Sequence, residues 1–386
     1  GEESDEDEEE EEEAAERASE TGAGTVEDEE DEEEAERRAR VRGGGKCSRD
    51  RECTAPLGAC VRGQCLCVAH RAGPWCRLLQ HRFDHPPGHS VRALVEGFEA
   101  GGLVLSQNNI GKGTRFANLL VLRLPREEAR PLGPVGPPLL RHLPSADPFR
   151  GRIWKSCAVV GSSGSVLAQE NGAWIDAHEA VYRVNEAPTR GFEAYVGRRT
   201  TLRVVSLAHW PSASAGALGL GERRSSAVDT GTRVVLALRS AQGYRSFLDS
   251  LVEAGPPQTA KGAKGGGARL LAMHPDALEA MGHAAQGAWS PSTGFAAIFL
   301  ALHSCAHVNL FGFHLAHRQG YEYHYWREEG EDGAGPSLPN RDANEWKLAR
   351  SLHVHGLVNF TEPCVLECHE DRRWCHACLD KASNFQ

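Results

Sequence analysis

The chain has 386 residues and a formal net charge of −10 at pH 7, but this average hides two parts of opposite sign. Residues 1–40 hold 22 acidic and four basic side chains, so the remainder carries a net charge of +8. So acidic a segment cannot bury enough apolar surface to offset its ordering entropy. The composition excludes a uniformly acidic or wholly disordered protein, and residues 1–45 are predicted to form a disordered acidic stem.

The chain also lacks the sequence signal of a membrane-spanning helix, which needs about 20 consecutive apolar residues. The most apolar stretches, 119–124 and 295–313, are short or interrupted by His, Ser and Asn. Because the chain begins at Gly1 rather than Met, we expect a trimmed or processed product. The lack of an anchor here therefore says nothing about the full-length protein.

Six of the twelve cysteines lie within residues 47–77, spaced C-x5-C-x6-C-x4-C-x-C-x8-C. Six cysteines allow fifteen pairings, and a module this short needs such cross-links in place of a core. The spacing resembles an EGF-like module, and that resemblance implies pairing of first with third, second with fourth and fifth with sixth. The alternative is a zinc knuckle, which fits poorly because six ligands in two unequal clusters do not suit tetrahedral zinc.

After the module the chain changes from proline-rich connections to the alternating pattern of an α/β protein. Strands are expected at 102–105 and 117–124, separated from the rest by a proline-rich stretch. From residue 153 onward strands are expected to alternate with helices, which implies a mainly parallel sheet. The expected strands are 157–160, 180–184, 201–205, 233–237, 270–273 and 307–313, and a helix is expected at 292–303. Two long Gly-, Ala- and Ser-rich loops, 212–232 and 255–267, are expected to be surface insertions.

The first expected strand of this region leads into Gly161-Ser-Ser-Gly. Such a turn lets a ligand approach the backbone closely, but tight strand-to-helix turns also use glycine for purely structural reasons. The turn alone therefore leaves both interpretations open.

The last four cysteines follow the pattern C-x3-C-x6-C-x2-C within a predicted C-terminal segment, 364–386. Two disulfides are favoured, and a structural zinc site is the alternative because the ligand count is right. The triplet beginning at Asn359 is a possible N-glycosylation site. Together with the cysteines, it points to the secretory pathway and its oxidising environment.

Three blocks in order resemble the motifs of the eukaryotic sialyltransferases, glycosyltransferase family 29. The large sialylmotif is matched at 156–205 by CAVVG, SG, IDxH, RVNxAPT, GFE and VGxxTT. The small sialylmotif is matched by PSTGF, FLALxxC and LxGF within 291–313, and a third motif by His-Tyr-Trp at 324–326. The resemblance covers roughly residues 150–350 of a predicted catalytic domain at 85–363.

The resemblance implies a GT-A-like variant fold and an inverting transfer of sialic acid, or a related acidic sugar, from a CMP-sugar to a glycan hydroxyl. The acceptor would be a glycoprotein, a glycolipid or a polysaccharide, and no metal or other cofactor is implied. The enzyme would reside in the Golgi lumen as a type II membrane protein, held by an anchor outside this chain. CMP-Kdo is the alternative donor, since it shares the CMP group and the anomeric carboxylate.

The resemblance also implies roles for individual residues, each at a position that matches a motif. His324 and Tyr325 would hold the phosphate, and Cys157 and Cys305 would form the disulfide that joins the two sialylmotifs. Asp176 and His178 are interpreted as structural. The implied donor-binding residues are Ser162, Ser163, Gly164, Asn185, Ser292, Thr293 and Gly294.

The sequence departs from the family pattern at two places. Ser162 and Ser165 stand where the family loop has asparagines, and serine reaches less far. The fourth motif has a general-base His five residues before a Glu, and here Asn340 precedes Glu345. An amide cannot take a proton.

Three explanations for the missing base remain open. Asp342 serves as base, His353 or His355 folds in, or the chain is a non-catalytic glycan-binding relative. Loss of a general base typically costs about 10²–10⁴-fold in rate, so an active transferase with an altered base is favoured. Nucleic-acid binding is disfavoured, because the net charge of +8 is spread thinly over residues 41–386. The sequence also has no basic patch interleaved with aromatic residues.

Overall fold

The structure is a computed structural model that describes part of the chain. The described residues are 43–80, 89–95, 102–110, 119–122, 130–134, 140–206, 232–238, 241–253, 270–285, 291–313, 322–326, 339–362, 364–365 and 378. The predicted acidic stem, apart from residues 43–45, and nearly all of the two predicted surface insertions lie outside these residues. Among the helices that are described, none combines the length and the apolar character needed to cross a bilayer.

Seven strands form one sheet in the order β11-β10-β9-β8-β7-β12-β13, and every neighbouring pair is parallel. The chain winds outward from β7 to β11 and then returns to the other side of β7 with β12 and β13. The expected mainly parallel α/β sheet is confirmed. The strands are β7 (Trp154–Val160), β8 (Ala180–Val184), β9 (Leu202–Ser206), β10 (Arg233–Ala237), β11 (Leu270–Ala272), β12 (Cys305–Phe311) and β13 (Asn359–Phe360).

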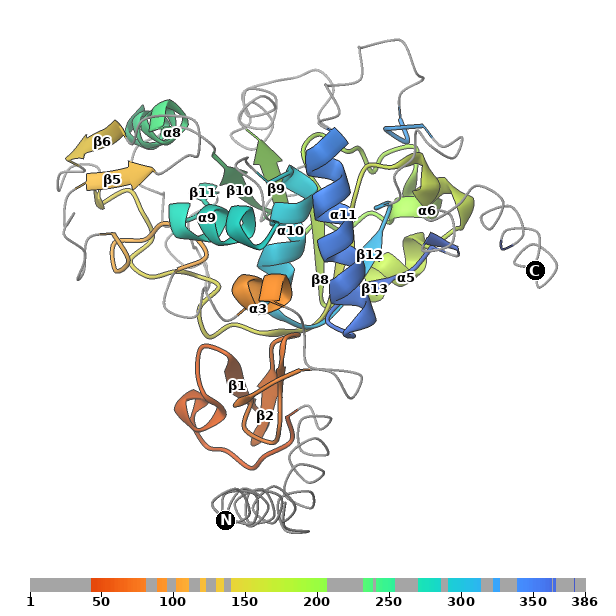
Figure 1. Cartoon of the computed structure of the whole chain (residues 1–386), viewed down its shortest axis with the longest axis horizontal. Coiled ribbons are helices and arrows are strands. Elements are labelled where there is room, and N and C mark those ends of the chain that lie inside the picture. Colours follow the sequence, from red (N-terminus) through yellow and green to blue (C-terminus); the bar gives the residue numbers. More distant parts are fainter. Residues whose placement is uncertain are drawn as a thin grey trace, which may run out of the picture.

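Helices cover both faces of the sheet (Figure 1). Alternate residues of β7 contribute to different cores, as the pleat of a strand requires. Cys157 and Val159 belong to the larger core, whereas Ala158 and Val160 belong to a smaller one. The larger core packs against α3 (His89–Val95), α8 (Ala241–Glu253), α9 (Pro275–Ala284), α10 (Thr293–Leu302) and α11 (Pro339–Val354). The smaller core packs against the 3-10 helix η2 (Gly164–Ala168), α5 (Gly172–Ala177) and α6 (Glu193–Val196).

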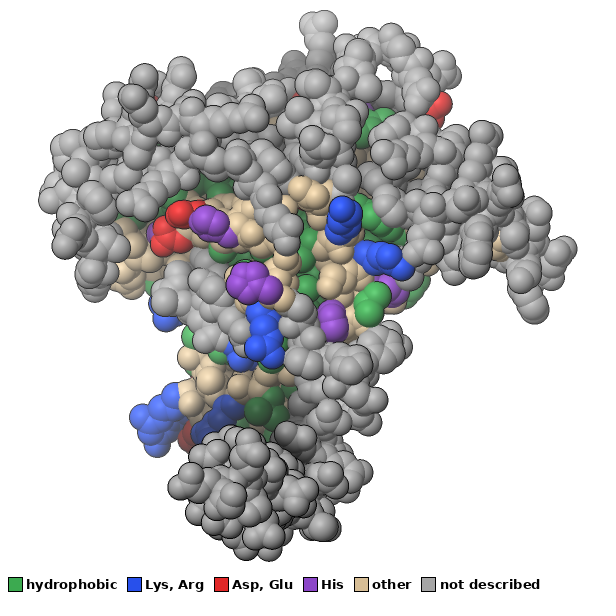
Figure 2. All heavy atoms as spheres, in the orientation of Figure 1, with side chains coloured by type: hydrophobic (Ala, Val, Ile, Leu, Met, Phe, Trp, Pro, Cys, Tyr) green, Lys and Arg blue, Asp and Glu red, His purple; other side chains and the backbone are tan. Residues whose placement is uncertain are grey.

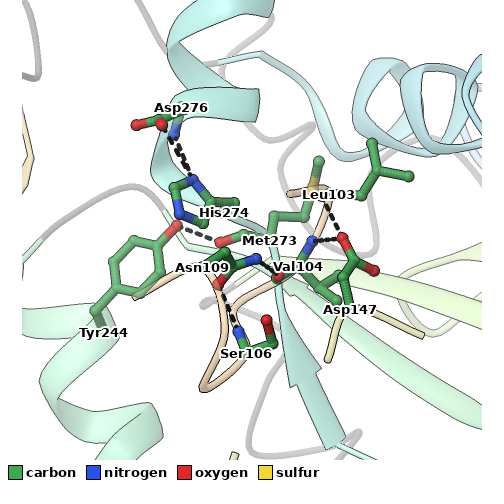
Figure 3. A network of polar contacts seen from close by, with 9 residues as sticks. All are labelled: Leu103, Val104, Ser106, Asn109, Asp147, Tyr244, Met273, His274 and Asp276. Carbon is green, nitrogen blue, oxygen red and sulfur yellow. Dashed lines mark hydrogen bonds and ion pairs between the residues drawn. The ribbon is translucent and has the colours of Figure 1, made fainter. Parts of the chain in front are cut away.

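The strand expected at 102–105 is wrong, since only an isolated bridge between Val104 and Met273 forms there. The backbone N–H groups of Leu103 and Val104 donate instead to one carboxylate oxygen of Asp147, at 2.6 and 3.2 Å. Asn109 donates its amide to the Val104 carbonyl, and these bonds are part of the network in Figure 3. Backbone pairing is limited to the Leu105 N–H with the Ala272 carbonyl and the Leu103 carbonyl with the His274 N–H, each at 2.9 Å. Side chains take the other backbone groups of Leu103 and Val104, so pairing stops at a single bridge.

The strand expected at 117–124 is described over residues 119–122, in a sheet separate from the main one. It corresponds to β5 (Leu119–Leu122), which pairs antiparallel with β6 (Arg130–Pro134). The ends of the expected strand, 117–118 and 123–124, lie outside the described residues. The partner strand contains two prolines, which cannot donate to a ladder.

The cysteine-rich module has the disulfide pairing that the EGF-like resemblance implied. Cys47 pairs with Cys60, Cys53 with Cys65, and Cys67 with Cys76. Although three of these sulfurs lie within 4.8 Å of one another, they are bonded as disulfides, which contradicts the zinc knuckle. Its elements are η1 (Asp50–Cys53), β1 (Gly58–Val61), β2 (Gln64–Cys67), β3 (Arg71–Ala72) and β4 (Leu78–Leu79).

The module packs against the sheet at the amino end of β12 (Figure 1). Ala69 donates its N–H to the Cys305 carbonyl at 2.7 Å, and His70 Nδ1 lies 3.1 Å from the Leu302 carbonyl. The rings of His70 and His303 meet edge to face, 4.6 Å apart. Burial lowers the pKa of His303 to about 4, so the His303 ring stays uncharged at neutral pH.

Charge is dispersed over the described part of the face that Figure 2 shows. Figure 2 shows the described Lys and Arg side chains in small, separate groups over the visible face of the protein. The excess of basic residues outside the stem therefore does not gather into one stripe on the part of this face that is described.

The C-terminal cysteines form at least one disulfide, between Cys364 and Cys378. This pairing contradicts a four-thiolate zinc site across the segment. Cys368 and Cys375, the remaining two cysteines, lie outside the described residues, so the second expected disulfide stays a prediction.

Cys157 and Cys305 form the disulfide that the family resemblance implied, and both are fully buried between β7 and β12. Replacing both by Ala should lower the free energy of unfolding by about 5 kcal/mol, because the bond closes a loop with a sequence separation of 148. Denaturant titration measures the loss. The matched pair Cys364→Ala with Cys378→Ala opens a loop with a separation of only 14 and should cost about 3 kcal/mol. Equal losses would contradict the loop-length argument.

Candidate active site

The carboxyl ends of β7 and β12 meet at the point where the strand order reverses. Gly161 follows β7 and donates its N–H to the Phe311 carbonyl at 2.7 Å. A Cβ on Gly161 would overlap the carbonyl of Gly312, and Gly312 itself has a φ of +68°. Both turns need glycine, and in parallel sheets this crossing of strand ends is where ligands bind.

The loop after β7 is tied to the loop after β12. Ser163 donates its N–H to the Gly312 carbonyl at 3.1 Å, and its hydroxyl caps η2 by accepting from the Ser165 N–H at 3.3 Å. Ser165 is buried, and within the described structure its hydroxyl has no hydrogen-bond partner. Ser162 is half-buried. Of the two departures from the family loop, Ser162 is therefore the one placed to meet a ligand.

The third motif packs directly on this loop. Gly164 donates its N–H to the Glu322 carbonyl at 2.8 Å, and Tyr325 donates its N–H to the Ser162 carbonyl at 3.0 Å. A Cβ on Gly164 would lie 2.9 Å from the backbone of Glu322. The large motif and the third motif therefore form one unit, although some 160 residues separate them in the sequence.

Tyr325 is buried on the smaller core, and its hydroxyl donates to the Pro188 carbonyl. Burial raises the pKa of Tyr325 to about 12, so the phenol stays protonated. Its single proton is engaged with Pro188, so the predicted phosphate contact would need a rearrangement. His324 is partly exposed, and its ring lies between the rings of Tyr323 and Trp326, at 4.7 and 4.6 Å.

Asn185 follows β8 in a left-handed conformation, with a φ of +42°. Its Oδ1 accepts from the Ser206 N–H at 3.0 Å, which ties the end of β8 to the end of β9. The buried guanidinium of Arg203, on β9, donates to the carbonyls of Asn185 and Ala187, at 2.6 and 3.2 Å. Burial lowers the pKa of Arg203 below its usual range, and Tyr325 and Glu186 oppose that shift. The loop that carries Asn185 thus rests on a buried cation.

The helix predicted from Ser292 is confirmed as α10, with Ser292 at its N-cap. The Ser292 hydroxyl accepts from the Phe295 N–H at 3.0 Å, and Thr293 is buried. A Cβ on Gly294 would lie 3.1 Å from the ring of Phe313, just beyond β12. The positive end of this helix therefore lies beside the carboxyl end of β12 and suits an anion.

Glu345 supports this helix start from the fourth motif. Its Oε1 accepts from the Ser292 N–H at 2.6 Å, and the carboxylate is buried. Asn340 and Asp342 are in the first turns of α11, at the same end as Glu345, and their side chains are outside the described structure. Whether Asp342 serves as base therefore stays a prediction.

His353 and His355 lie at the other end of α11. At about 1.5 Å of rise per residue, His353 is roughly 20 Å along the helix from Asn340. The His353 ring packs against Phe360, with ring centroids 5.4 Å apart. The hypothesis that one of these histidines replaces the missing base is wrong on this geometry.

Asp176 and His178 have the structural roles expected of them. Asp176 accepts the backbone N–H groups of Arg198 and Arg199 at 2.9–3.0 Å. His178 Nδ1 lies 2.8 Å from the Trp174 carbonyl, and its Nε2 lies 2.8 Å from the Asn309 amide. Both side chains are engaged in bonds that hold turns of the protein itself.

Glu362 is a buried carboxyl that the sequence motifs do not predict. It comes just after β13, and its Oε1 accepts the N–H of Gly312. Burial raises the pKa of Glu362 to about 7. Hydrogen bonds from the backbone N–H groups of Gly312 and of Glu362 itself act in the opposite direction and lower the pKa. No periodicity or motif distinguishes this Glu, because its contact depends on which strand lies beside β13.

A sequence profile of glycosyltransferase family 29 (sialyltransferase) matches residues 134–356. This match spans more than half of the chain and includes the loop after β7, Asn185, the start of α10 and the third motif. The chain belongs to glycosyltransferase family 29. Glu362 lies beyond the matched region of this family 29 protein.

Individual relatives match parts of the family 29 chain. A mouse CMP-N-acetylneuraminate-beta-galactosamide-alpha-2,3-sialyltransferase 1 is 33% identical over 187 residues, 47% of this chain and 50% of the relative. A human alpha-N-acetyl-neuraminyl-2,3-beta-galactosyl-1,3-N-acetyl-galactosaminide alpha-2,6-sialyltransferase is 55% identical over 64 residues, 17% of this chain and 21% of the relative. A japonica rice sialyltransferase-like protein 1 is 50% identical over 70 residues, 18% of each.

The match covers about half the length of the mouse alpha-2,3-sialyltransferase 1 and of its chimpanzee counterpart. Among solved structures, a mammalian sialyltransferase in complex with Gal-beta-1-3GalNAc-ortho-nitrophenol aligns with a TM-score of 0.45 and 21% identity. That alignment covers 71% of this chain and 96% of the other. It is too distant to place a ligand here.

Glu345→Ala should lower the free energy of unfolding by about 1–3 kcal/mol, because the Ser292 N–H loses its buried acceptor. Hydrogen exchange of the amides at 292–296 should accelerate in the same variant. Glu345→Gln keeps an oxygen at this place and should exchange like the wild type. An exposed control, Glu279→Ala on α9, should change neither measurement. Equal exchange in the Ala and Gln variants would contradict the proposed support of α10.

Proposed function

We propose that the protein transfers sialic acid, with inversion, from a CMP-sugar donor to a hydroxyl of a glycan acceptor. One observation carries the proposal: the motifs of family 29 converge at the carboxyl ends of β7 and β12. There the start of α10, the loop 161–165 and the segment 322–326 lie together, joined by the hydrogen bonds and close contacts described above.

In the proposed site the N-terminus of α10 receives the anionic part of the donor. The backbone N–H groups of its first turn and the hydroxyls of Ser292 and Thr293 are suited to a phosphate or a carboxylate. His324 would stabilise the charge that develops on the CMP leaving group. Asn185 would hydrogen-bond the nucleotide while its Oδ1 stays on Ser206.

We propose that the reaction uses neither a metal nor another cofactor. CMP leaves as a phosphate monoester that is stable as an anion, so the leaving group does not require a cation to neutralise it. The CMP-sugar is a substrate. Tyr325 would act by holding the third motif in place, since its phenol binds the Pro188 carbonyl and its N–H binds Ser162.

We propose Asp342 as the general base for the acceptor hydroxyl. It is two residues after Asn340 near the start of α11, whose Glu345 already contacts the N-cap of α10. A carboxylate can take the proton that the amide of Asn340 cannot. The histidines at the far end of α11 are excluded by their distance.

The proposed setting is the lumen of the Golgi, with the enzyme anchored to the membrane by a segment outside this chain. The cysteine pairs described above suit an oxidising compartment, and exposed Asn359 in its sequon would carry an N-glycan there. The module packs at the amino end of β12, opposite the proposed site, so a stem on that side would leave the site accessible.

CMP release from CMP-sialic acid, measured with a panel of glycan acceptors, tests the function. His324→Ala and Asp342→Asn should each lower turnover at least tenfold. The first removes the group proposed to stabilise the charge of the leaving CMP, and the second removes the proposed acceptor of the hydroxyl proton. His283→Ala, on the exposed side of α9, should leave turnover unchanged. CMP-Kdo is the parallel donor, and release from it alone would replace sialic acid in the proposal. CMP binding without release from either donor would contradict catalysis.

A further inference from the structure

The segment that follows the family-matched region is fixed along the open side of β12. β13 pairs in parallel with β12 through Asn359 opposite Asn309 and Phe360 opposite Leu310. Thr361 then donates both its N–H and its hydroxyl to the Leu310 carbonyl, at 3.1 and 2.8 Å. These bonds hold the next residue, Glu362, against the turn that follows β12.

Glu362 enters the protein interior at this turn. The residue is 7% exposed, and its Oε1 accepts the N–H of Gly312. Within the described structure Oε2 has no hydrogen-bond partner. A buried carboxyl with one satisfied oxygen is costly, so it is retained more readily where it fixes a particular geometry.

A short chain of hydrogen bonds leads from Glu362 to the proposed donor site. Glu362 holds the N–H of Gly312, and the carbonyl of Gly312 accepts the N–H of Ser163. The next residue, Gly164, holds the third motif through the Glu322 carbonyl. The glycine turn has little freedom, since Gly161 and Gly312 are in close contact.

We propose that Glu362 is a positioning residue that fixes Gly312 and, through it, the Ser163–Gly164 loop in the geometry that binds the donor nucleotide. That the bound nucleotide is CMP follows from the proposed function, and the inference rests on that function to this extent. It adds a residue from outside the family-matched region to the support of the site, and it makes the segment 359–362 part of the donor site's framework.

The protonation state of Glu362 then affects donor binding. With the pKa raised to about 7 by burial, the carboxyl is neutral in mildly acidic solution and ionises as the pH rises through 7. The shift comes from burial, and only the two backbone N–H groups oppose it. A neutral carboxyl still accepts from Gly312. An ionised one adds a negative charge beside a site for an anion, so donor affinity should fall above pH 7.

Calorimetric titration with CMP, together with hydrogen exchange at 161–166, tests this role in the full chain. Glu362→Ala should weaken CMP binding about tenfold and accelerate exchange in the loop. Asp147→Ala is the matched control, because Asp147 is also a buried carboxyl that accepts backbone N–H groups, but of Leu103, Val104 and Phe149. It should lower the melting temperature while leaving CMP affinity and loop exchange unchanged.

Glu362→Gln separates the charge from the contact and keeps the test open if the Ala variant fails to fold. It should bind CMP like the wild type at pH 6 and at least threefold more tightly than the wild type at pH 8. Comparing the two proteins at each pH cancels the titration of the phosphate of CMP. Matching profiles for wild type and Gln variant, or unchanged loop exchange in a folded Ala variant, would overturn the positioning role. No CMP binding by the wild type would overturn the proposed function instead, and the exchange measurement would still decide the link to the loop.

Discussion

The close contact of Gly161 with Gly312 is the constraint on which the site depends. It brings together the ends of two strands that are neighbours in the sheet but about 150 residues apart in the chain. With no side chain at Gly161, the loop after β7 can pass over β12 and bond to the Gly312 carbonyl through Ser163. The loop then presents Ser162 and Gly164 to the third motif. A larger residue at Gly161 would separate the two turns.

This contact is supported by a disulfide nearer the amino ends of the two strands and by residues on both faces of the sheet. The buried disulfide of Cys157 and Cys305 joins the same two strands nearer their amino ends. On one face Glu345 holds the N-cap of α10, and on the other Tyr325 packs into the smaller core and bonds Pro188. Polar groups near the site are thus largely occupied in holding the protein itself, which preorganises the loop before any ligand arrives.

Much of the fold follows from local patterns. The boundaries of β8 and β10 agree with their apolar runs, because a strand buried on both faces of a parallel sheet reads as a short continuous apolar stretch. The start of α10 was predictable from Ser292 before an apolar run. The strand expected at 102–105 is reduced to a single bridge because Asp147, far along the chain, takes the N–H groups of Leu103 and Val104. Sequence patterns do not report such long-range side-chain contacts.

The candidate site divides in the same way. Its motifs are contiguous in sequence and could be predicted, whereas the partners that orient them could not. Nothing in the sequence pairs Tyr325 with Pro188, Arg203 with Asn185 or Glu362 with Gly312, since each pairing depends on strand order. For the missing base the sequence is the more informative source, because the Asn at position 340 can be read from it directly. The geometry adds only that His353 and His355 are too far away to replace the base.

A crystal structure of the protein with CMP tests the central claim most directly. The account predicts that the nucleotide lies at the carboxyl ends of β7 and β12, with its phosphate within hydrogen-bonding distance of the first turn of α10 and of His324. It also predicts that the contact between Gly161 and Gly312 is unchanged. A nucleotide bound elsewhere, or bound here with its phosphate directed away from α10, would contradict it.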